Sequence, residues 1–117
     1  GGHDYLICTG QRTITASADF CADEGMVLSF IDDLDENTWV SATAVTAFGW
    51  VSYEATSYWI ANTKGDSPIF PWAIGHNEPS GDGSCIHMGR YGDAPELWND
   101  VPCTDQYDWG WVCETDD

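Results

Sequence analysis

The sequence predicts an α+β fold in a single domain. Helical spacing of apolar residues is confined to the first half of the chain, whereas the second half carries short runs of residues that favour strands. A long stretch rich in Gly, Pro, Asn, Asp and Ser interrupts these strands, and this order of elements is typical of the α+β class. A chain of 117 residues is long enough to bury one core and too short for two, so we expect one domain over residues 1–117.

The first expected elements are a short strand and a helix. Residues 5–8 (Tyr-Leu-Ile-Cys) favour a strand. From residue 13 to about residue 24 the spacing becomes helical, and three residues fall on one face: Ile14, Ala18 and Cys21. Thr13 or Thr15 can cap the start of this helix. Gly25 is a suitable stop in the left-handed conformation, and the run 26–31 is expected to be extended.

A second helix is predicted over about residues 36–47. Asp33 or Asp35 can cap it, because a carboxylate accepts hydrogen bonds from the first free N–H groups of a helix. The acidic residues here briefly imitate a calcium-binding EF-hand loop. Counting from Asp33, however, the sixth position is Thr38 and the twelfth is Ala44, where an EF-hand needs Gly and Glu, so this interpretation is rejected.

The remaining strands are short and lie on either side of the long loop. Residues 50–53 and 58–61 are expected to form two strands joined by a turn. Residues 62–84 form the irregular stretch, and loops of this length in compact domains are usually functional. Two further strands are predicted over 85–88 and 109–113, which gives two helices followed by strands around a long loop.

Composition and charge exclude several classes of function. Hydrophobic residues make up 43% of the chain and aromatic residues 14%, which is too much apolar material for a disordered segment. A net charge of −17 argues against binding to nucleic acid or to an anionic membrane surface. No run of 18 apolar residues occurs, so we expect no membrane insertion. The acidity is explained either by solubility or by oxygen ligands that collect divalent cations.

The five cysteines favour an oxidising, extracellular setting. They are widely spaced, with no C-x-x-C motif, so a zinc ribbon or a thioredoxin-type site is not expected. An odd number allows at most two internal disulfides and leaves one thiol over. Four cysteines can pair in three ways, and spacing alone does not choose between them.

Several motifs follow one another in the order of a known family. The segment 21–31 reproduces the spacing C-x3-G-x2-L-x2-I, and 50–53 (Trp-Val-Ser-Tyr) resembles the W-I-G-L core strand. In the second half, 78–80 (Glu-Pro-Ser) resembles the E-P-N sugar motif, 98–100 is a W-N-D motif, and 111–114 matches the terminal F-V-C-E pattern. With these motifs the chain resembles the C-type lectin-like domain along nearly its whole length. The resemblance implies a C-type lectin-like fold, with two helices flanking antiparallel sheets and a long irregular loop.

The resemblance also implies a disulfide pairing. In this family the pairs correspond to Cys21–Cys113, which ties the first helix to the last strand, and to Cys85–Cys103, at the base of the long loop. Cys8 has no family partner. It is either a small apolar residue of a strand or the source of a disulfide to a neighbouring subunit.

The resemblance further implies a Ca²⁺ site that holds sugar hydroxyls. Carried over residue by residue, the metal ligands are Glu78, Ser80, Asp82, Asn99 and Asp100, and all of these except Asp82 would also contact carbohydrate. Hard Ca²⁺ prefers such oxygen ligands, and positions left open on the ion can take two neighbouring hydroxyls. The Glu-Pro motif is similar to that of the mannose, fucose and glucose class, and its Pro peptide is cis in the family.

This chain departs from the family pattern at the site. Ser80 stands where the family has an amide, and the loop before Cys85 is short and lacks the usual acid. A salt bridge from Lys64 or Arg90 to the predicted ligands would compete with the ion. Three aromatic residues are candidate walls of a sugar site, although core or rim positions are the simpler expectation: Trp72, Tyr91 and Tyr107.

Three functions are compatible with these observations. The leading hypothesis is a secreted, calcium-dependent carbohydrate-binding module with no catalytic activity, since no G-x-S-x-G, H-E-x-x-H or P-loop motif occurs. The second is a structural protein that self-assembles into an oligomer or filament, with Cys8 linking subunits. The third is an ice- or mineral-binding protein, because the same family includes such proteins.

Overall fold

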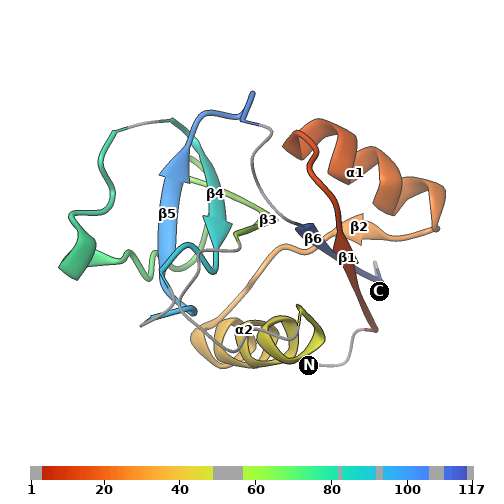
Figure 1. Ribbon diagram of the computed structural model, residues 1–117, viewed down its shortest axis with the longest axis horizontal. Coiled ribbons are helices and arrows are strands. Elements are labelled where there is room, and N and C mark those ends of the chain that lie inside the picture. Colours follow the sequence, from red (N-terminus) through yellow and green to blue (C-terminus); the bar gives the residue numbers. More distant parts are fainter. Residues whose placement is uncertain (1–3, 49–56, 82, 92–93, 106–109, 116–117) are drawn as a thin grey trace.

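The computed structural model describes residues 4–48, 57–81, 83–91, 94–105 and 110–115. These ranges contain two α-helices, one short 3-10 helix and six strands (Figure 1). In chain order the elements are β1 (Tyr5–Thr9), α1 (Ile14–Asp23), β2 (Val27–Leu28), α2 (Leu34–Phe48), β3 (Tyr58–Thr63), η1 (Ile74–His76), β4 (Cys85–Met88), β5 (Trp98–Val101) and β6 (Gly110–Glu114). None of these helices is long and apolar enough to cross a membrane.

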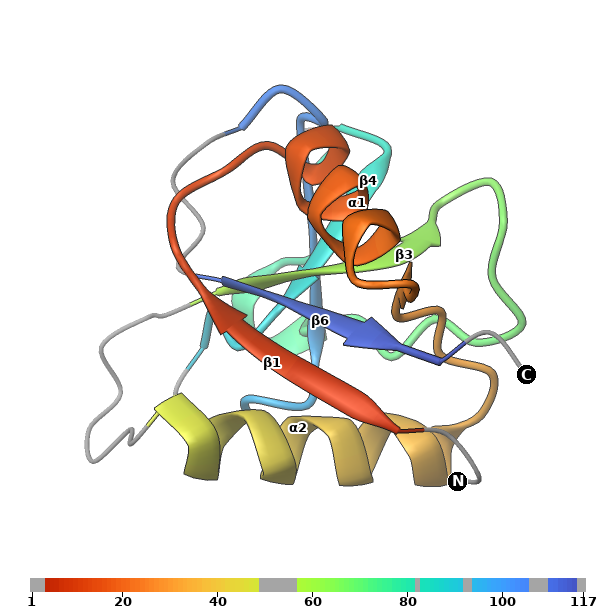
Figure 2. The same cartoon turned by 90° about the vertical axis from the view of Figure 1, so that its right-hand side faces the viewer.

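The six strands form one sheet in the order β1-β6-β3-β4-β5, and β2 pairs with β6 beyond this path. All pairings are antiparallel except that of β3 with β6, where Tyr58 lies opposite Gly110 in a parallel register. The sheet is therefore mixed, which the sequence pattern did not indicate. Figure 2 shows α1 and α2 on opposite sides of the β1–β6 pair.

Local contacts cap the start of each α-helix and terminate α1. The Thr13 side chain accepts a hydrogen bond from the Ala16 N–H at 3.2 Å and caps α1, and Gly25 follows the helix in the left-handed conformation with φ 73°. At the start of α2, Asp33 Oδ1 accepts from the Glu36 N–H at 2.7 Å. Both predicted helices are confirmed, and Asp33 rather than Asp35 caps the second.

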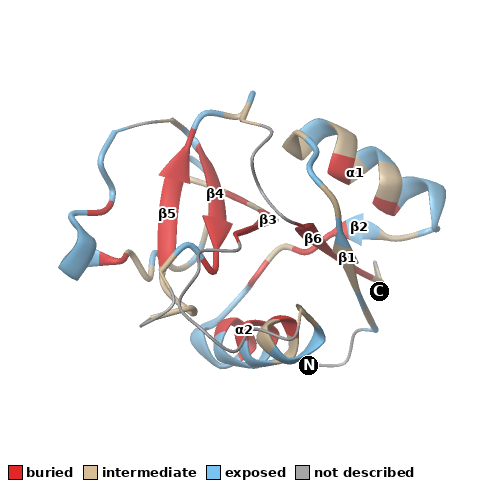
Figure 3. Ribbon diagram, viewed as in Figure 1, coloured by how far each residue is buried: buried red, intermediate tan, exposed pale blue. Residues whose placement is uncertain are grey.

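The sheet separates two hydrophobic cores, because successive side chains of a strand point to opposite faces. One core packs against α2 and contains Tyr58, Ile60 and Val112, together with Ile31, Val40, Ala44, Ile86, Met88 and Trp98. The other packs against α1 and contains Cys21, Leu28, Trp59, Cys85, Val101, Trp111 and Cys113. Strands β4, β5 and β6 are buried along their whole length (Figure 3). The largest side chains in these cores are Trp59, Trp98 and Trp111, which are all buried.

Both predicted disulfides are present. Cys21–Cys113 joins α1 to β6 across a sequence separation of 92 residues. Cys85–Cys103 joins the start of β4 to the segment after β5 across 18 residues. Cys8 remains a free thiol on β1 and is half-buried.

Within the run 26–31, which was expected to be extended, Val27–Leu28 forms a strand. At the end of this run the Asn62 side chain binds the backbone of Ile31: Oδ1 accepts from its N–H at 2.7 Å and Nδ2 donates to its carbonyl at 2.9 Å. Strand β5 was not predicted as a strand, although it carries the W-N-D motif. The strand predicted over 50–53 lies outside the described residues.

The long loop runs from Lys64 to Ser84 and is tied to β5. The Trp98 N–H donates to the Pro71 carbonyl at 2.7 Å, and the Ala73 N–H donates to the Trp98 carbonyl at 3.0 Å. These bonds fix the middle of the loop beside the start of β5, so that the two motifs of the predicted site lie on neighbouring segments.

Cys8 provides a test of the expected link between subunits. Burial is the main reason that the pKa of its thiol is raised, the Glu24 carboxylate adds to this, and Arg12 partly offsets it. Because the thiolate is the reactive form, we expect Cys8 to react with a disulfide reagent more slowly in the folded protein than in urea at neutral pH. A Cys8→Ser variant gives the background. Equal reaction rates in the folded and the unfolded state would contradict the expected protection of the thiol. The link between subunits is tested separately: a dimer on non-reducing gels that Cys8→Ser abolishes would support it.

Candidate functional site

The predicted site is assembled where the long loop meets β5. The Glu78–Pro79 peptide is cis, as the resemblance implied, and Asn77 before it is left-handed with φ 63°. The Glu78 N–H donates to the Ala73 carbonyl at 3.1 Å, next to the bonds that hold the loop on Trp98. The loop therefore carries Glu78 and Ser80 to the strand that carries Asn99 and Asp100.

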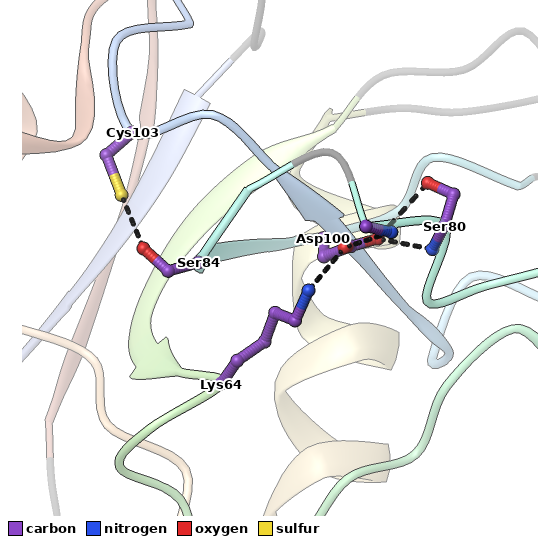
Figure 4. A network of polar contacts seen from close by, with 6 residues as sticks. Lys64, Ser80, Ser84, Asp100 and Cys103 are labelled. Atoms are coloured by element: carbon purple, nitrogen blue, oxygen red, sulfur yellow. Dashed lines mark hydrogen bonds and ion pairs between the residues drawn. The ribbon is translucent and has the colours of Figure 1, made fainter.

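Asp100 is fully buried and is the centre of a polar network (Figure 4). Its Oδ1 accepts from the Ser80 N–H at 2.9 Å and from Ser80 Oγ at 3.3 Å. Its Oδ2 accepts from the Gly81 N–H at 2.9 Å and from Lys64 Nζ at 2.8 Å. Burial alone would raise the pKa of Asp100, but the hydrogen bonds from Lys64, Ser80 and Gly81 outweigh it, so the pKa lies well below its usual value.

Asn99 has a different set of neighbours. It lies opposite His87 in the β4–β5 register, and its Nδ2 is 2.8 Å from His87 Nε2. Asn99 is 6% exposed, and its Oδ1 is buried without a hydrogen-bond partner among the described residues. A buried carbonyl oxygen in this state costs about 1–3 kcal/mol, so it favours a ligand that brings a donor or a cation.

Glu78 shows the same feature. Its side chain is 8% exposed, and Oε1 is buried without a hydrogen-bond partner within the described ranges. Its Oε2 accepts a hydrogen bond from the Tyr91 hydroxyl. The Tyr91 ring in turn stacks on His76, with centroids 3.9 Å apart and planes 11° apart. Tyr91 therefore both orients the carboxylate and presents an aromatic surface beside it.

The other aromatic candidates lie elsewhere. Trp72 packs edge-on against Trp98 with centroids 6.3 Å apart and contacts the core beside α2, so it belongs to the rim of that core. Tyr107 and the predicted metal ligand Asp82 lie outside the described residues.

His76 and His87 are the site residues that sequence reasoning missed. Pairing the W-N-D segment with the segment after Cys85, which the family disulfide brings close, would have placed His87 opposite Asn99.

The donor set around Asp100 does not fit a Ca²⁺ ion. A carboxylate offers roughly four lone-pair positions, and four protein donors already occupy those of Asp100. One of these donors is an ammonium group, which repels a divalent cation. Among the predicted ligands that the structure describes, Glu78 and Asn99 each keep one buried oxygen without a hydrogen-bond partner, whereas Ca²⁺ takes roughly six to eight oxygen ligands. No group of three or more His, Cys, Asp or Glu in the described ranges is arranged to hold a metal.

Gly83 lets the end of the loop approach β5 closely. A Cβ at this position would lie 2.2 Å from the Val101 carbonyl oxygen, which is backbone and cannot rotate away. We expect Gly83→Ala to lower the free energy of unfolding by about 1–3 kcal/mol, because the loop must shift to relieve the clash. The measurement is urea unfolding beside Gly65→Ala, since a Cβ at Gly65 meets nothing within 4 Å. Equal losses in the two variants would contradict this role of Gly83.

The family model for the lectin C-type domain matches residues 10–115. The chain belongs to the C-type lectin domain family. Its relatives include the human C-type lectin domain family 4 member G, which is 29% identical over 123 residues and 97% of this chain. The chain spans only 39% of the length of that relative.

Solved structures of the family have the same fold. The cow C-type carbohydrate-recognition domain of CD23, solved in the presence of a GlcNAc2Man3 oligosaccharide, superimposes with a TM-score of 0.73 at 21% identity, over 97% of this chain and 88% of that one. The Ca²⁺-independent C-type lectin SPL-2 from Saxidomus purpuratus superimposes with a TM-score of 0.76 at 20% identity, over 99% and 88%. The solved structures with this fold thus include a carbohydrate-recognition domain and a lectin named as Ca²⁺-independent.

Proposed function

We propose that this C-type lectin domain binds carbohydrate and catalyses no reaction. The observation that carries the proposal is the pair of buried acceptors, Glu78 Oε1 and Asn99 Oδ1, which have no hydrogen-bond partner among the described residues. Both lie in the two motifs that the family uses for sugars. Sugar hydroxyls are donors as well as acceptors, so a bound sugar would satisfy oxygens whose burial is otherwise costly.

The aromatic pair beside Glu78 supports a sugar ligand. His76 is exposed and Tyr91 is half-buried, and their stacked rings form a flat edge next to the carboxylate. One face of a sugar ring carries C–H groups that pack on aromatic rings, while its hydroxyls reach polar groups at the side. Tyr91 is suited to both tasks, because its hydroxyl holds Glu78 Oε2 in place.

Family membership supports the same function. The relatives carry lectin names, and the CD23 domain was solved in the presence of an oligosaccharide. The Glu78-Pro79 motif further suggests ligands of the mannose, fucose and glucose class. We also propose that the protein is secreted, because two disulfides are typical of an oxidising compartment.

Calcium dependence stays a prediction of the motif resemblance alone. It requires Lys64 to leave Asp100, because the ammonium group and a divalent ion compete for the same carboxylate oxygen. The function proposed for this geometry therefore uses no metal. SPL-2 is named as a Ca²⁺-independent lectin, so the fold is compatible with that mode.

A glycan array tests the proposed function, with the protein applied once in calcium and once in excess chelator. We expect binding to a subset of glycans, lost in Glu78→Gln, which keeps the shape of the side chain and changes an acceptor into a donor. Glu24→Gln is the matched control, because Glu24 is exposed at the end of α1. Circular dichroism verifies that both variants fold. Binding to no glycan in either buffer, or binding unaffected by Glu78→Gln, would overturn the proposal.

A further inference from the structure

We propose that Lys64 replaces a divalent cation at Asp100 and keeps Ca²⁺ out of this site. The Lys64 ammonium lies 2.8 Å from Asp100 Oδ2 and meets a carboxylate that is fully buried. A buried carboxylate needs a positive partner, and here that partner is a side chain of the same protein, not a free ion.

Lys64 is held in position by the backbone around it. It follows directly after β3, and its N–H donates to the Ser84 carbonyl at 3.0 Å. The bridge between Thr63 and Asp66 closes the turn in which it lies. The side chain is 33% exposed, so its stem lies against the protein while its charge reaches Asp100. The ammonium is thus positioned by the end of a sheet strand and by the base of the long loop.

The other hydrogen bonds to Asp100 leave few positions at which a divalent cation could replace the Lys64 ammonium. Ser80 and Gly81 donate to the same carboxylate, so the loop behind the Glu-Pro motif is organised by Asp100 without a metal. In a chain of net charge −17, free cations are attracted to the surface in general. The specific position at Asp100 is nevertheless neutralised by a cation that cannot dissociate from the chain.

A consequence for ligand binding follows, and it rests on the proposed function. If the domain binds sugar, the binding should need no calcium and should survive excess chelator. The metal measurement below contains no sugar, so it fails or succeeds independently of the carbohydrate proposal.

The test is calcium binding by equilibrium dialysis with a radioactive tracer, supported by thermal unfolding in calcium or magnesium at equal ionic strength. The variants are Lys64→Met, which keeps the stem and removes the charge, and Lys64→Arg, which keeps the charge. Arg12→Met is the control for net charge, because it removes one positive charge from a side chain that lies over the rings of Phe20 and Trp111 instead of beside Asp100. The double variant Lys64→Met/Asp100→Asn removes both partners of the pair.

We expect the wild type, Lys64→Arg and Arg12→Met to show only weak binding, with equal thermal shifts in calcium and magnesium. Lys64→Met should gain a saturable calcium site in the sub-millimolar to millimolar range of extracellular modules, and the double variant should lose it again. A saturable wild-type site that Asp100→Asn removes would overturn the proposal. The proposal would also be overturned if the Lys64→Met variant folds, as judged by circular dichroism, but gains no calcium-specific binding.

Discussion

Replacing Asp100 by Ala is expected to lower the free energy of unfolding by about 3 kcal/mol. The substitution removes the acceptor of four hydrogen bonds at once, including two from the backbone N–H groups of Ser80 and Gly81. Lys64 can turn to water because it is 33% exposed, so most of the loss comes from the loop. Urea unfolding measures the change, with Asp19→Ala as the control because Asp19 is exposed on α1. Similar losses in both variants would contradict the central role of Asp100.

Acid should remove the contribution that the Asp100 carboxylate makes to the free energy of unfolding. The pKa of Asp100 is lowered in the folded state, so its carboxylate stabilises the fold fully above its unfolded pKa of about 3.9. Below about pH 4 the unfolded chain takes up the proton first, and the contribution declines as the pH falls towards the folded pKa. The difference in unfolding free energy between wild type and Asp100→Asn should therefore be larger at neutral pH than at about pH 3. A difference that does not change with pH would contradict the ionised network.

Removing the disulfide Cys21–Cys113 by a double substitution to Ala is expected to cost about 4–5 kcal/mol. On the loop-entropy model the cost grows with the length of chain that the bond closes, and this bond spans 92 residues. The bond also joins α1 to β6 inside the core that packs against α1, so the substitution removes two buried sulfur atoms from that core. A chain of this size has a total stability of about 5–15 kcal/mol, so the variant should approach the limit of folding.

The second disulfide is the natural comparison. Cys85–Cys103 closes 18 residues, and the same model gives about 3 kcal/mol for its removal. In thermal unfolding of the two double variants, the Cys21/Cys113 variant should have the lower midpoint temperature. The reverse order would show that strain or residual structure, rather than loop length, decides the effect.

The sequence predicted the helices well, because their signals are local. Thr13, Asp33 and Gly25 act at the ends of the helices through contacts within a few residues. The family resemblance supplied the disulfides and the cis peptide at Pro79, which spacing alone did not. The parallel pairing of β3 with β6 escaped prediction because it joins segments far apart in the chain.

The sequence predicted which residues belong to the candidate site better than it predicted the contacts between them. The motifs named Glu78, Asn99 and Asp100, and the loop does bring them to one region. Whether Asp100 faces an ion or an ammonium depends on where the turn after β3 places Lys64, and no local pattern specifies that distance. Similarly, the hydroxyl of Tyr91 reaches Glu78 across a loop whose path the sequence does not determine.

The alternation of β6 between the two cores has a consequence for how the chain finds its register. Val112 faces the α2 side, whereas Trp111 and Cys113 face the α1 side. A slip of one residue would invert this arrangement and turn the sulfur of Cys113 away from Cys21. Only a correctly aligned β6 therefore places Cys113 where it can form the bond with Cys21 that the structure shows.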